Sequence, residues 1–93
     1  MHKKEASDLF KLLGDENRVK ICKFLYNKGE MCACELLKIV DCKQATLSHH
    51  MNLLVKSNLV FARENGKWVH YTINKELLLE LMNFISSPCQ CTK

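Results

Sequence analysis

Residues 44–56 have the sequence QATLSHHMNLLVK, and this stretch decides the fold. Leu47, Met51 and Leu54 recur at helical spacing, which predicts a helix over 44–56 with one apolar stripe. The remaining faces carry the polar residues Gln44, Thr46, Ser48, His49 and Asn52. Short polar side chains of this kind can reach base edges in a DNA groove, so we interpret the stretch as a recognition helix. The alternative is an ordinary solvated helix face.

The residues before this helix predict a shorter one. Leu36, Leu37 and Val40 supply its apolar positions, and it ends near Asp41. A break of a few residues then leads into the recognition helix. Two short helices joined by a tight turn form a helix-turn-helix, which we assign to residues 32–57.

A β-hairpin follows directly, and we assign it to residues 58–73 as a wing. Residues 59–64 and 67–73 alternate in β fashion around Asn65-Gly66, a strong signal for a two-residue hairpin turn. Trp68 and Tyr71 are an odd number of residues apart, so they lie on opposite faces of the second strand. Arg63 and Lys67 flank the turn and are candidate phosphate contacts, with a solvated hairpin tip as the alternative.

Further helices lie at both ends of the chain. Residues 1–14 predict an N-terminal helix that stops at Gly14, and Asp15 then caps a second helix that ends near Lys28-Gly29. Residues 75–86 predict a last helix that is apolar nearly all the way round. A domain of this size can bury only one side of such a helix, so we expect a second subunit to cover the rest, giving a homodimer through the terminal helices.

The chain of 93 residues is long enough for one domain, which we assign to residues 1–93. Its expected fold class is mainly α with a β-hairpin wing: a winged helix-turn-helix with five or six short helices. The net charge of +4 is concentrated in residues 43–73, where four Lys or Arg face one Asp or Glu, as expected for a surface that meets a polyanion. Without a long apolar run or a secretory signal, we expect a soluble cytoplasmic protein.

Six cysteines call for an explanation, because the core does not need disulfides. We expect Cys22 and Cys42 to be small core residues. Cys32 and Cys34 form a Cys-x-Cys pair in the first turn of the helix before the recognition helix, and thiolates bind soft metal ions. Side chains two apart point to different sides of a regular helix, so joint binding predicts a locally unwound helix start. Residues 87–93 form a tail that holds the second pair, Cys89 and Cys91.

Four segments carry a family resemblance, in matching order over roughly residues 6–73: LLGDENRVKICKFL, CACELL, QATLSHHMNLLVKSNLV and GKWVHYTI. They closely resemble the ArsR/SmtB family of winged-helix metalloregulatory repressors, of the arsenite/antimonite-sensor type. The resemblance implies a homodimer that represses a resistance operon and leaves its operator when a toxic ion binds. Two-fold symmetry predicts an inverted-repeat operator. The segment CACEL looks like the family's thiol motif, so Cys32 and Cys34 would be ion ligands.

Departures from the family pattern bear on the choice of ion. Similar arsenite sensors often have a third cysteine where this chain has Leu37, and cadmium and lead sensors add cysteines from an N-terminal arm that here holds only His2. The family's zinc-type ligands on the last helix also look absent. We expect As(III) or Sb(III) as the inducer, with Cd(II) or Pb(II) as the alternative. Cys89 and Cys91 are candidate further ligands, unless they are idle thiols.

Two other functional classes are the alternatives to a metal-released repressor. A redox or persulfide switch could join Cys22 to a C-terminal cysteine and leave the Cys-x-Cys pair a bystander. An enzyme lacks support, since the chain has no Cys-x-x-Cys motif, Gly-rich phosphate loop or acid/base cluster. We expect His50 to be a structural residue, His70 to be a packing or surface residue, and Arg18 to form a structural ion pair or contact a phosphate.

Overall fold

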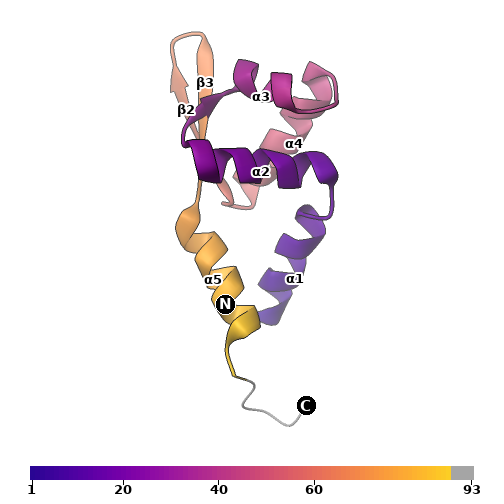
Figure 1. Cartoon of the computed structure of the whole chain (residues 1–93), viewed down its shortest axis with the longest axis vertical. Helices are drawn as coiled ribbons and strands as arrows, with labels where there is room; N and C mark the ends of the chain where they lie inside the picture. Colours follow the sequence, from indigo (N-terminus) through magenta and orange to yellow (C-terminus); the bar gives the residue numbers. More distant parts are fainter. Residues whose placement is uncertain (89–93) are drawn as a thin grey trace.

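The computed structural model describes residues 1–88, which form five helices and a three-stranded antiparallel sheet (Figure 1). The elements are α1 (Lys3–Leu12), α2 (Glu16–Lys28), β1 (Met31–Cys32), α3 (Ala33–Ile39), α4 (Gln44–Lys56), β2 (Val60–Asn65), β3 (Trp68–Ile73) and α5 (Lys75–Ser86). Helices α2, α3 and α4 gather with the hairpin at one end of the molecule, while α1 and α5 extend toward the other. The predicted winged helix-turn-helix fold is confirmed.

Local sequence signals set the ends of α2. The Asp15 carboxylate accepts hydrogen bonds from the backbone N–H groups of Asn17 (2.9 Å) and Arg18 (3.2 Å), so it satisfies two of the unpaired donors of the first turn. Gly29 ends the helix at a φ of 87°, a conformation that glycine adopts without a steric penalty. Both ends lie where the sequence predicts them.

The core forms where α2, α3, α4 and the base of the sheet meet. The predicted stripe of α4 is buried, and it packs in one cluster with side chains from the other elements. The largest fully buried side chains are Ile21, Leu25, Leu36, Met51, Leu54, Leu59 and Val60. The apolar face of the recognition helix packs against this core, and its polar face is exposed to solvent.

The wing is a regular hairpin, but its turn lies one residue later than predicted. The strand register runs from Val60 opposite Ile73 to Asn65 opposite Trp68, so the two turn residues are Gly66 and Lys67 rather than Asn65 and Gly66. Gly66 has a φ of 66°, and the first central position of such a turn favours glycine for this reason. The shift places Lys67 at the tip of the wing.

A short third strand, β1, was not predicted. Its two residues pair with β3, with Met31 opposite Tyr71 and Cys32 opposite His70. The sheet order is therefore β1-β3-β2, with the wing strand β3 in the centre. Two residues are too few for a period-two pattern, so the sequence carries no signal for this strand.

Helices α1 and α5 leave apolar surface uncovered. On α5, Leu81 is buried, whereas Leu79, Met82 and Ile85 are 49%, 62% and 62% exposed, and Phe10 on α1 is 49% exposed. The structure thus keeps the unpartnered apolar face that the sequence predicts for the last helix. Among the described residues, no helix has both the length and the apolar character needed to cross a membrane.

The cap of α2 predicts a pH dependence of stability. The backbone hydrogen bond from Arg18 is the main cause that holds the pKa of Asp15 below its usual value of 3.8. A carboxylate with a lowered pKa in the folded state stabilises the protein above the unfolded pKa, and this contribution is lost as the pH falls through the folded pKa. Asp15→Asn keeps a cap acceptor but does not titrate. We expect the wild type to be more stable in urea near neutral pH and to lose that advantage progressively as the pH falls below the usual carboxyl pKa of 3.8. A difference between the two proteins that stays constant with pH would contradict this assignment.

Candidate functional site

The outer face of α4 presents the five residues of this helix that the sequence assigns to DNA. All five are exposed: Gln44, Thr46, Ser48, His49 and Asn52. Leu47, Met51 and Leu54 face the core on the other side, as predicted. The helix therefore offers a continuous hydrogen-bonding surface from its first to its third turn.

A partly buried hydrogen-bond network connects α4 to α2 and α1. His50 is buried, and its Nδ1 accepts a hydrogen bond of 2.9 Å from Nε of Arg18. The same guanidinium donates through Nη1 to the carbonyl oxygen of Leu12 at the end of α1 (3.0 Å). His50 is thus a structural residue, as expected, while Arg18 bonds a ring nitrogen and a carbonyl rather than forming the expected ion pair with a carboxylate.

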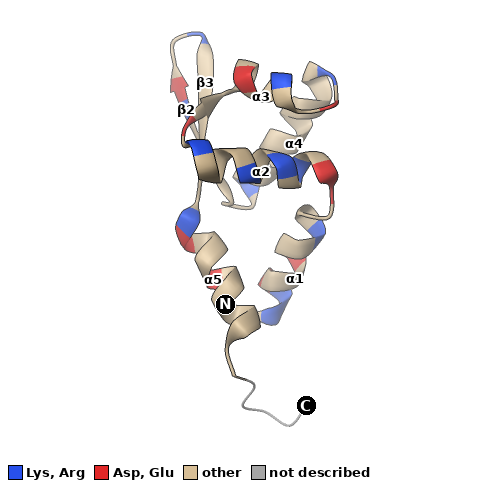
Figure 2. Ribbon diagram, viewed as in Figure 1, with Lys and Arg blue, Asp and Glu red and all other residues tan. Residues whose placement is uncertain are grey.

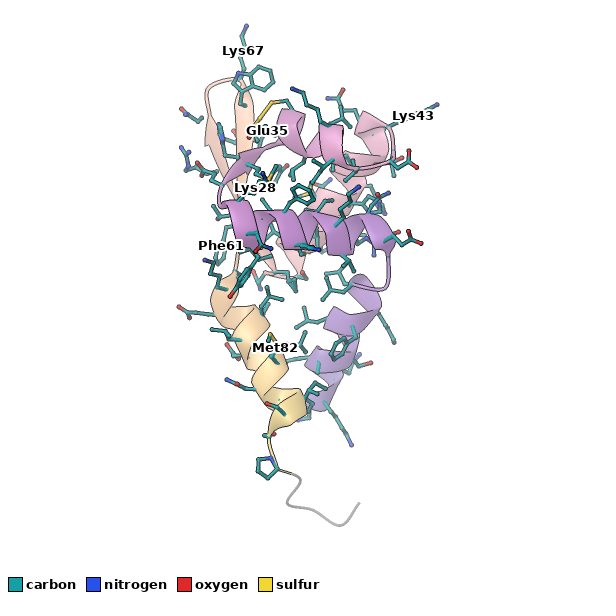
Figure 3. All side chains as sticks on the ribbon, in the orientation of Figure 1. Lys28, Glu35, Lys43, Phe61, Lys67 and Met82 are labelled. Carbon is teal, nitrogen blue, oxygen red and sulfur yellow. A yellow bond between two sulfur atoms is a disulfide. The ribbon has the colours of Figure 1, made fainter. Side chains whose placement is uncertain are left out.

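The wing carries one paired and one projecting basic residue. Arg63 donates to both carboxylate oxygens of Glu30, at 3.1 Å and 2.8 Å. These hydrogen bonds lower the pKa of Glu30 and raise that of Arg63. The guanidinium therefore anchors the wing to the loop before β1. A DNA phosphate that binds Arg63 would have to share this guanidinium with the carboxylate of Glu30. Lys67 projects from the wing tip, and Lys43 points outward at the start of α4 (Figures 2 and 3).

Cys32 and Cys34 are brought together at the start of α3. Their sulfur atoms are joined in a disulfide, drawn as a yellow bond in Figure 3. Cys32 is buried in β1 with an extended backbone (φ −83°, ψ 161°), and Cys34 is exposed in the first turn of α3. The expectation that both thiols lie in the helix and need a distorted turn to meet is wrong, because Cys32 precedes the helix. The two sulfurs therefore meet while α3 keeps its regular first turn.

Two further contacts connect this thiol pair to its surroundings. The backbone N–H of Cys32 donates to Oε1 of Glu35 (2.9 Å), which fixes the first turn of α3. Cys32 also lies opposite His70 in the sheet. A ligand that pulls on the two sulfurs therefore acts on α3 and on the wing strand β3 together.

The other cysteines contribute little to this site. Cys22 is buried, and burial raises the pKa of its thiol to about 11, so it stays protonated and unreactive near neutral pH. This agrees with the core role expected for it. Cys42 is only partly buried and packs at the edge of the core. Cys89 and Cys91 lie outside the described residues. Within residues 1–88, no group of three or more His, Cys, Asp or Glu is placed to hold a metal ion.

Cys32 and Cys34 supply some, but not all, of the ligands that a soft metal ion needs. Two adjacent thiols are the ligands that thiophilic ions prefer, and they can supply two of the three sulfurs that pyramidal As(III) takes. A third ligand would have to come from elsewhere. No histidine or carboxylate completes the site within the part of the chain that the structure describes.

A cavity of about 430 Å³ opens beside the thiol pair, between α3, α4 and β3. Cys34 lines it, whereas Cys32 is not among the lining residues. Its other lining residues are Ala33, Leu37, Gln44, Leu47, Ser48, Met51, Lys67, Trp68, Val69 and Tyr71. Sequence reasoning missed this cavity, because its walls come from three elements whose relative placement no local pattern encodes.

Known proteins resemble this chain in sequence and in structure. The family described as bacterial regulatory protein, arsR family, matches residues 15–61. An arsenical resistance operon repressor from Staphylococcus xylosus is 40% identical, with 98% of this chain and 92% of the relative covered. A cadmium resistance transcriptional regulatory protein, CadC, from Listeria innocua is 43% identical over 83% of this chain, which spans only 65% of that relative's length.

Among solved structures, an ArsR-like transcriptional regulator from Rhodococcus sp. RHA1 superposes with a TM-score of 0.77, over 89% of this chain and 77% of that one. At 22% identity this likeness concerns the fold alone. The matching family consists of regulatory proteins, which agrees with the expectation that the chain is not an enzyme. Since the family match covers about half of the chain and the staphylococcal relative is covered almost throughout, the chain belongs to the arsR family of bacterial regulatory proteins.

Proposed function

We propose that this chain is a cytoplasmic, homodimeric repressor of a metal(loid)-resistance operon. It occupies an inverted-repeat operator when no ion is bound and is released when As(III) or Sb(III) binds Cys32 and Cys34. The observation that carries the proposal is the meeting of the two sulfurs at the junction of β1 and α3, next to the recognition helix. The names of the staphylococcal and listerial relatives support a role in resistance to arsenicals or cadmium.

Release follows from the connections of the thiol pair. The polar face of α4 and the tip of the wing must keep a fixed separation to fit a groove and its phosphates at the same time. Capture of an ion by Cys32 and Cys34 moves the start of α3 and the bridge to β3, which changes that separation. An effector shifts the equilibrium only by as much as it prefers the altered state, so the ion must bind the state that fits DNA poorly.

The identity of the ion depends on the third ligand. As(III) and Sb(III) need one sulfur beyond Cys32 and Cys34, whereas Cd(II) and Pb(II) accept three or four ligands. Cys89 and Cys91 are the candidate donors that this chain offers, from the same or the partner subunit. Because As(III) and Sb(III) need fewer ligands than Cd(II) and Pb(II), the two thiols of this motif favour As(III) or Sb(III) as the inducer. Cd(II) or Pb(II) is the alternative.

A second candidate function is a redox-sensing repressor, and the Cys32–Cys34 disulfide is the observation that favours it. Oxidation would then use the same pair, instead of the pairing of Cys22 with a tail cysteine. A peptide mass map after polysulfide treatment distinguishes these cases, because the cross-link appears within one short peptide or joins two distant ones.

The exposed apolar faces of α1 and α5 support the dimer. Phe10, Leu79, Met82 and Ile85 line or flank one groove of about 460 Å³ between these helices. Exposed apolar clusters of this kind are typical of obligate interfaces. Two-fold symmetry would then place the two α4 helices about 34 Å apart, one turn of duplex.

Asn52 and Asn27 form a matched pair for testing the DNA face. Both are exposed on helices, but Asn52 lies on α4 and Asn27 at the far end of α2. With a duplex selected by the wild type from random sequences, we expect Asn52→Ala to weaken specific binding by about 1–3 kcal/mol and to relax the preference at one base position. Asn27→Ala should bind like the wild type. Equal affinities of the two variants in fluorescence anisotropy would argue against α4 as the reading element.

The role of the thiols is tested by release of the same duplex from reduced protein. We expect micromolar arsenite or antimonite to release the wild type and Cys42→Ser, but not Cys32→Ser or Cys34→Ser, with DNA affinity in the absence of ions unchanged in all four proteins. Parallel titrations with cadmium and lead rank the ions by the concentration at which each releases the duplex. Release of both motif variants at the wild-type arsenite concentration would refute the assigned site. Weaker arsenite binding by the double variant Cys89→Ser, Cys91→Ser would identify the tail as the source of the third ligand.

Met82→Glu tests the dimer interface. A charge placed in an apolar interface loses its hydration without gaining a partner, so we expect the variant to sediment as a monomer at micromolar concentrations where the wild type is a dimer. Asn52→Glu adds the same charge to the exposed face of α4, away from α1 and α5, and should leave the dimer intact. A dimer of unchanged stability in Met82→Glu would place the interface elsewhere.

A further inference from the structure

We propose that Glu30 restrains the DNA contact of the wing, because its carboxylate competes with the DNA backbone for the guanidinium of Arg63. Glu30 is then a positioning residue: it lowers the affinity for the operator through Arg63 and touches no DNA itself. The inference rests on the proposed function and concerns how the wing is regulated within the chain, not the thiol pair.

The contact between Glu30 and Arg63 is bidentate. Nε of Arg63 donates to Oε2 of Glu30 at 3.1 Å, and Nη2 donates to Oε1 at 2.8 Å. A planar guanidinium binds a carboxylate and a phosphate through the same pair of parallel hydrogen bonds. An edge of Arg63 that could bind a phosphate is therefore occupied by a group of the chain itself.

The ion pair runs across the sheet rather than along the wing. Arg63 on β2 lies opposite His70 on the central strand β3, and His70 lies opposite Cys32 on β1. Glu30 immediately precedes β1, so the two charged side chains meet across the width of the sheet. The pair thus holds the guanidinium toward β1, whereas Lys67 projects from the wing tip (Figure 3).

Arg63 remains within reach of DNA when the pair opens. Its side chain is 56% exposed, and it lies three positions before Gly66 at the wing turn, about 10 Å along the strand. An exposed ion pair contributes little free energy, because water and salt screen it. A phosphate can therefore displace the carboxylate, and the free energy of opening the pair is subtracted from that of DNA binding.

Sharing of the guanidinium weakens the DNA contact as well. A phosphate that uses the donors left free on Arg63 lies on the other side of the same guanidinium as Glu30. Both partners are negatively charged, so each reduces the attraction of the other to the single positive charge. By either route, the wing contact is weaker with Glu30 than without it.

The affinity of the reduced, ion-free full chain for the duplex selected by the wild type tests this competition. Glu30→Gln removes the charge and keeps the length of the side chain. We expect it to bind the duplex about three- to tenfold more tightly than the wild type, which corresponds to two exposed ion pairs in a dimer. Glu30→Ala should shift the affinity in the same direction. Weaker or unchanged binding by both variants would overturn the proposal, because a carboxylate that prepares Arg63 for DNA has the opposite effect.

Glu64→Gln is the matched control for the loss of one negative charge on the wing. Glu64 is exposed on β2 and is the neighbour of Arg63 in sequence, so it lies on the opposite face of the strand. We expect Glu64→Gln to strengthen DNA binding less than Glu30→Gln does. In an Arg63→Ala background the two glutamine variants should have equal effects. An excess effect of Glu30→Gln that survives without Arg63 would also overturn the proposal.

The salt dependence distinguishes competition from a structural role of Glu30. Each guanidinium that gains a phosphate steepens the fall of log K with log salt by about 0.9. We expect a steeper slope for Glu30→Gln than for Glu64→Gln, and a return to the shallower slope when Arg63→Ala is added to Glu30→Gln. Equal slopes in the two glutamine variants would contradict the competition, because Arg63 would have gained no phosphate.

Failure of the proposed function is recognised separately. A wild type that selects no duplex from random sequences refutes the repressor and, with it, this inference. Selective binding by the wild type without a gain in Glu30→Gln refutes only the restraint by Glu30 and leaves the repressor mechanism standing.

Discussion

The antiparallel bridge between β1 and β3 is the constraint on which the rest of the site depends. It is only two residues long, yet it places Cys32 in extended backbone immediately before α3 and opposite His70 of the wing strand. A helical Cys32 would point its sulfur away from Cys34. Because one residue of the pair is in a strand and the other in a helix, the sulfurs meet, and the cysteine pair belongs to both the wing and the helix-turn-helix.

A second constraint fixes the recognition helix from the opposite side. His50 is the one buried polar side chain among the described core residues, and Arg18 satisfies it while bonding the carbonyl of Leu12. A buried polar group is stable only when its hydrogen bonds are made, so this network permits few orientations of α4 against α2 and α1. A movement at the thiol pair would therefore shift the positions of the wing and of α3 relative to α4, because the network holds α4 in place.

The sequence predicted those features that depend on local patterns. The apolar stripe set the bounds of α4 at residues 44–56, the cap residues set α2, and the glycine near the turn predicted the hairpin to within one residue. Features that depend on residues far apart were missed: β1, the contact between Arg18 and His50, the pair Arg63–Glu30 and the cavity beside Cys34. Their partners are separated by 32 residues or more in both side-chain pairs, and no spacing rule connects them. The error about Cys32 has the same origin, since the strand that takes it out of the helix is formed by pairing with β3.

The shared location of Cys34, the cavity and the exposed polar side chains of α4 has a thermodynamic consequence for the proposed function. Coupling between two ligands is reciprocal, so an effector that weakens DNA binding by some factor is itself bound more weakly by that factor when the protein is on DNA. In this chain the coupling requires no long pathway, because Gln44 and Ser48 of the recognition helix and Cys34 of the thiol pair line the same space. The strength of induction should then follow how far the bound group separates α4 from the wing, and not only how tightly the sulfurs hold the ion.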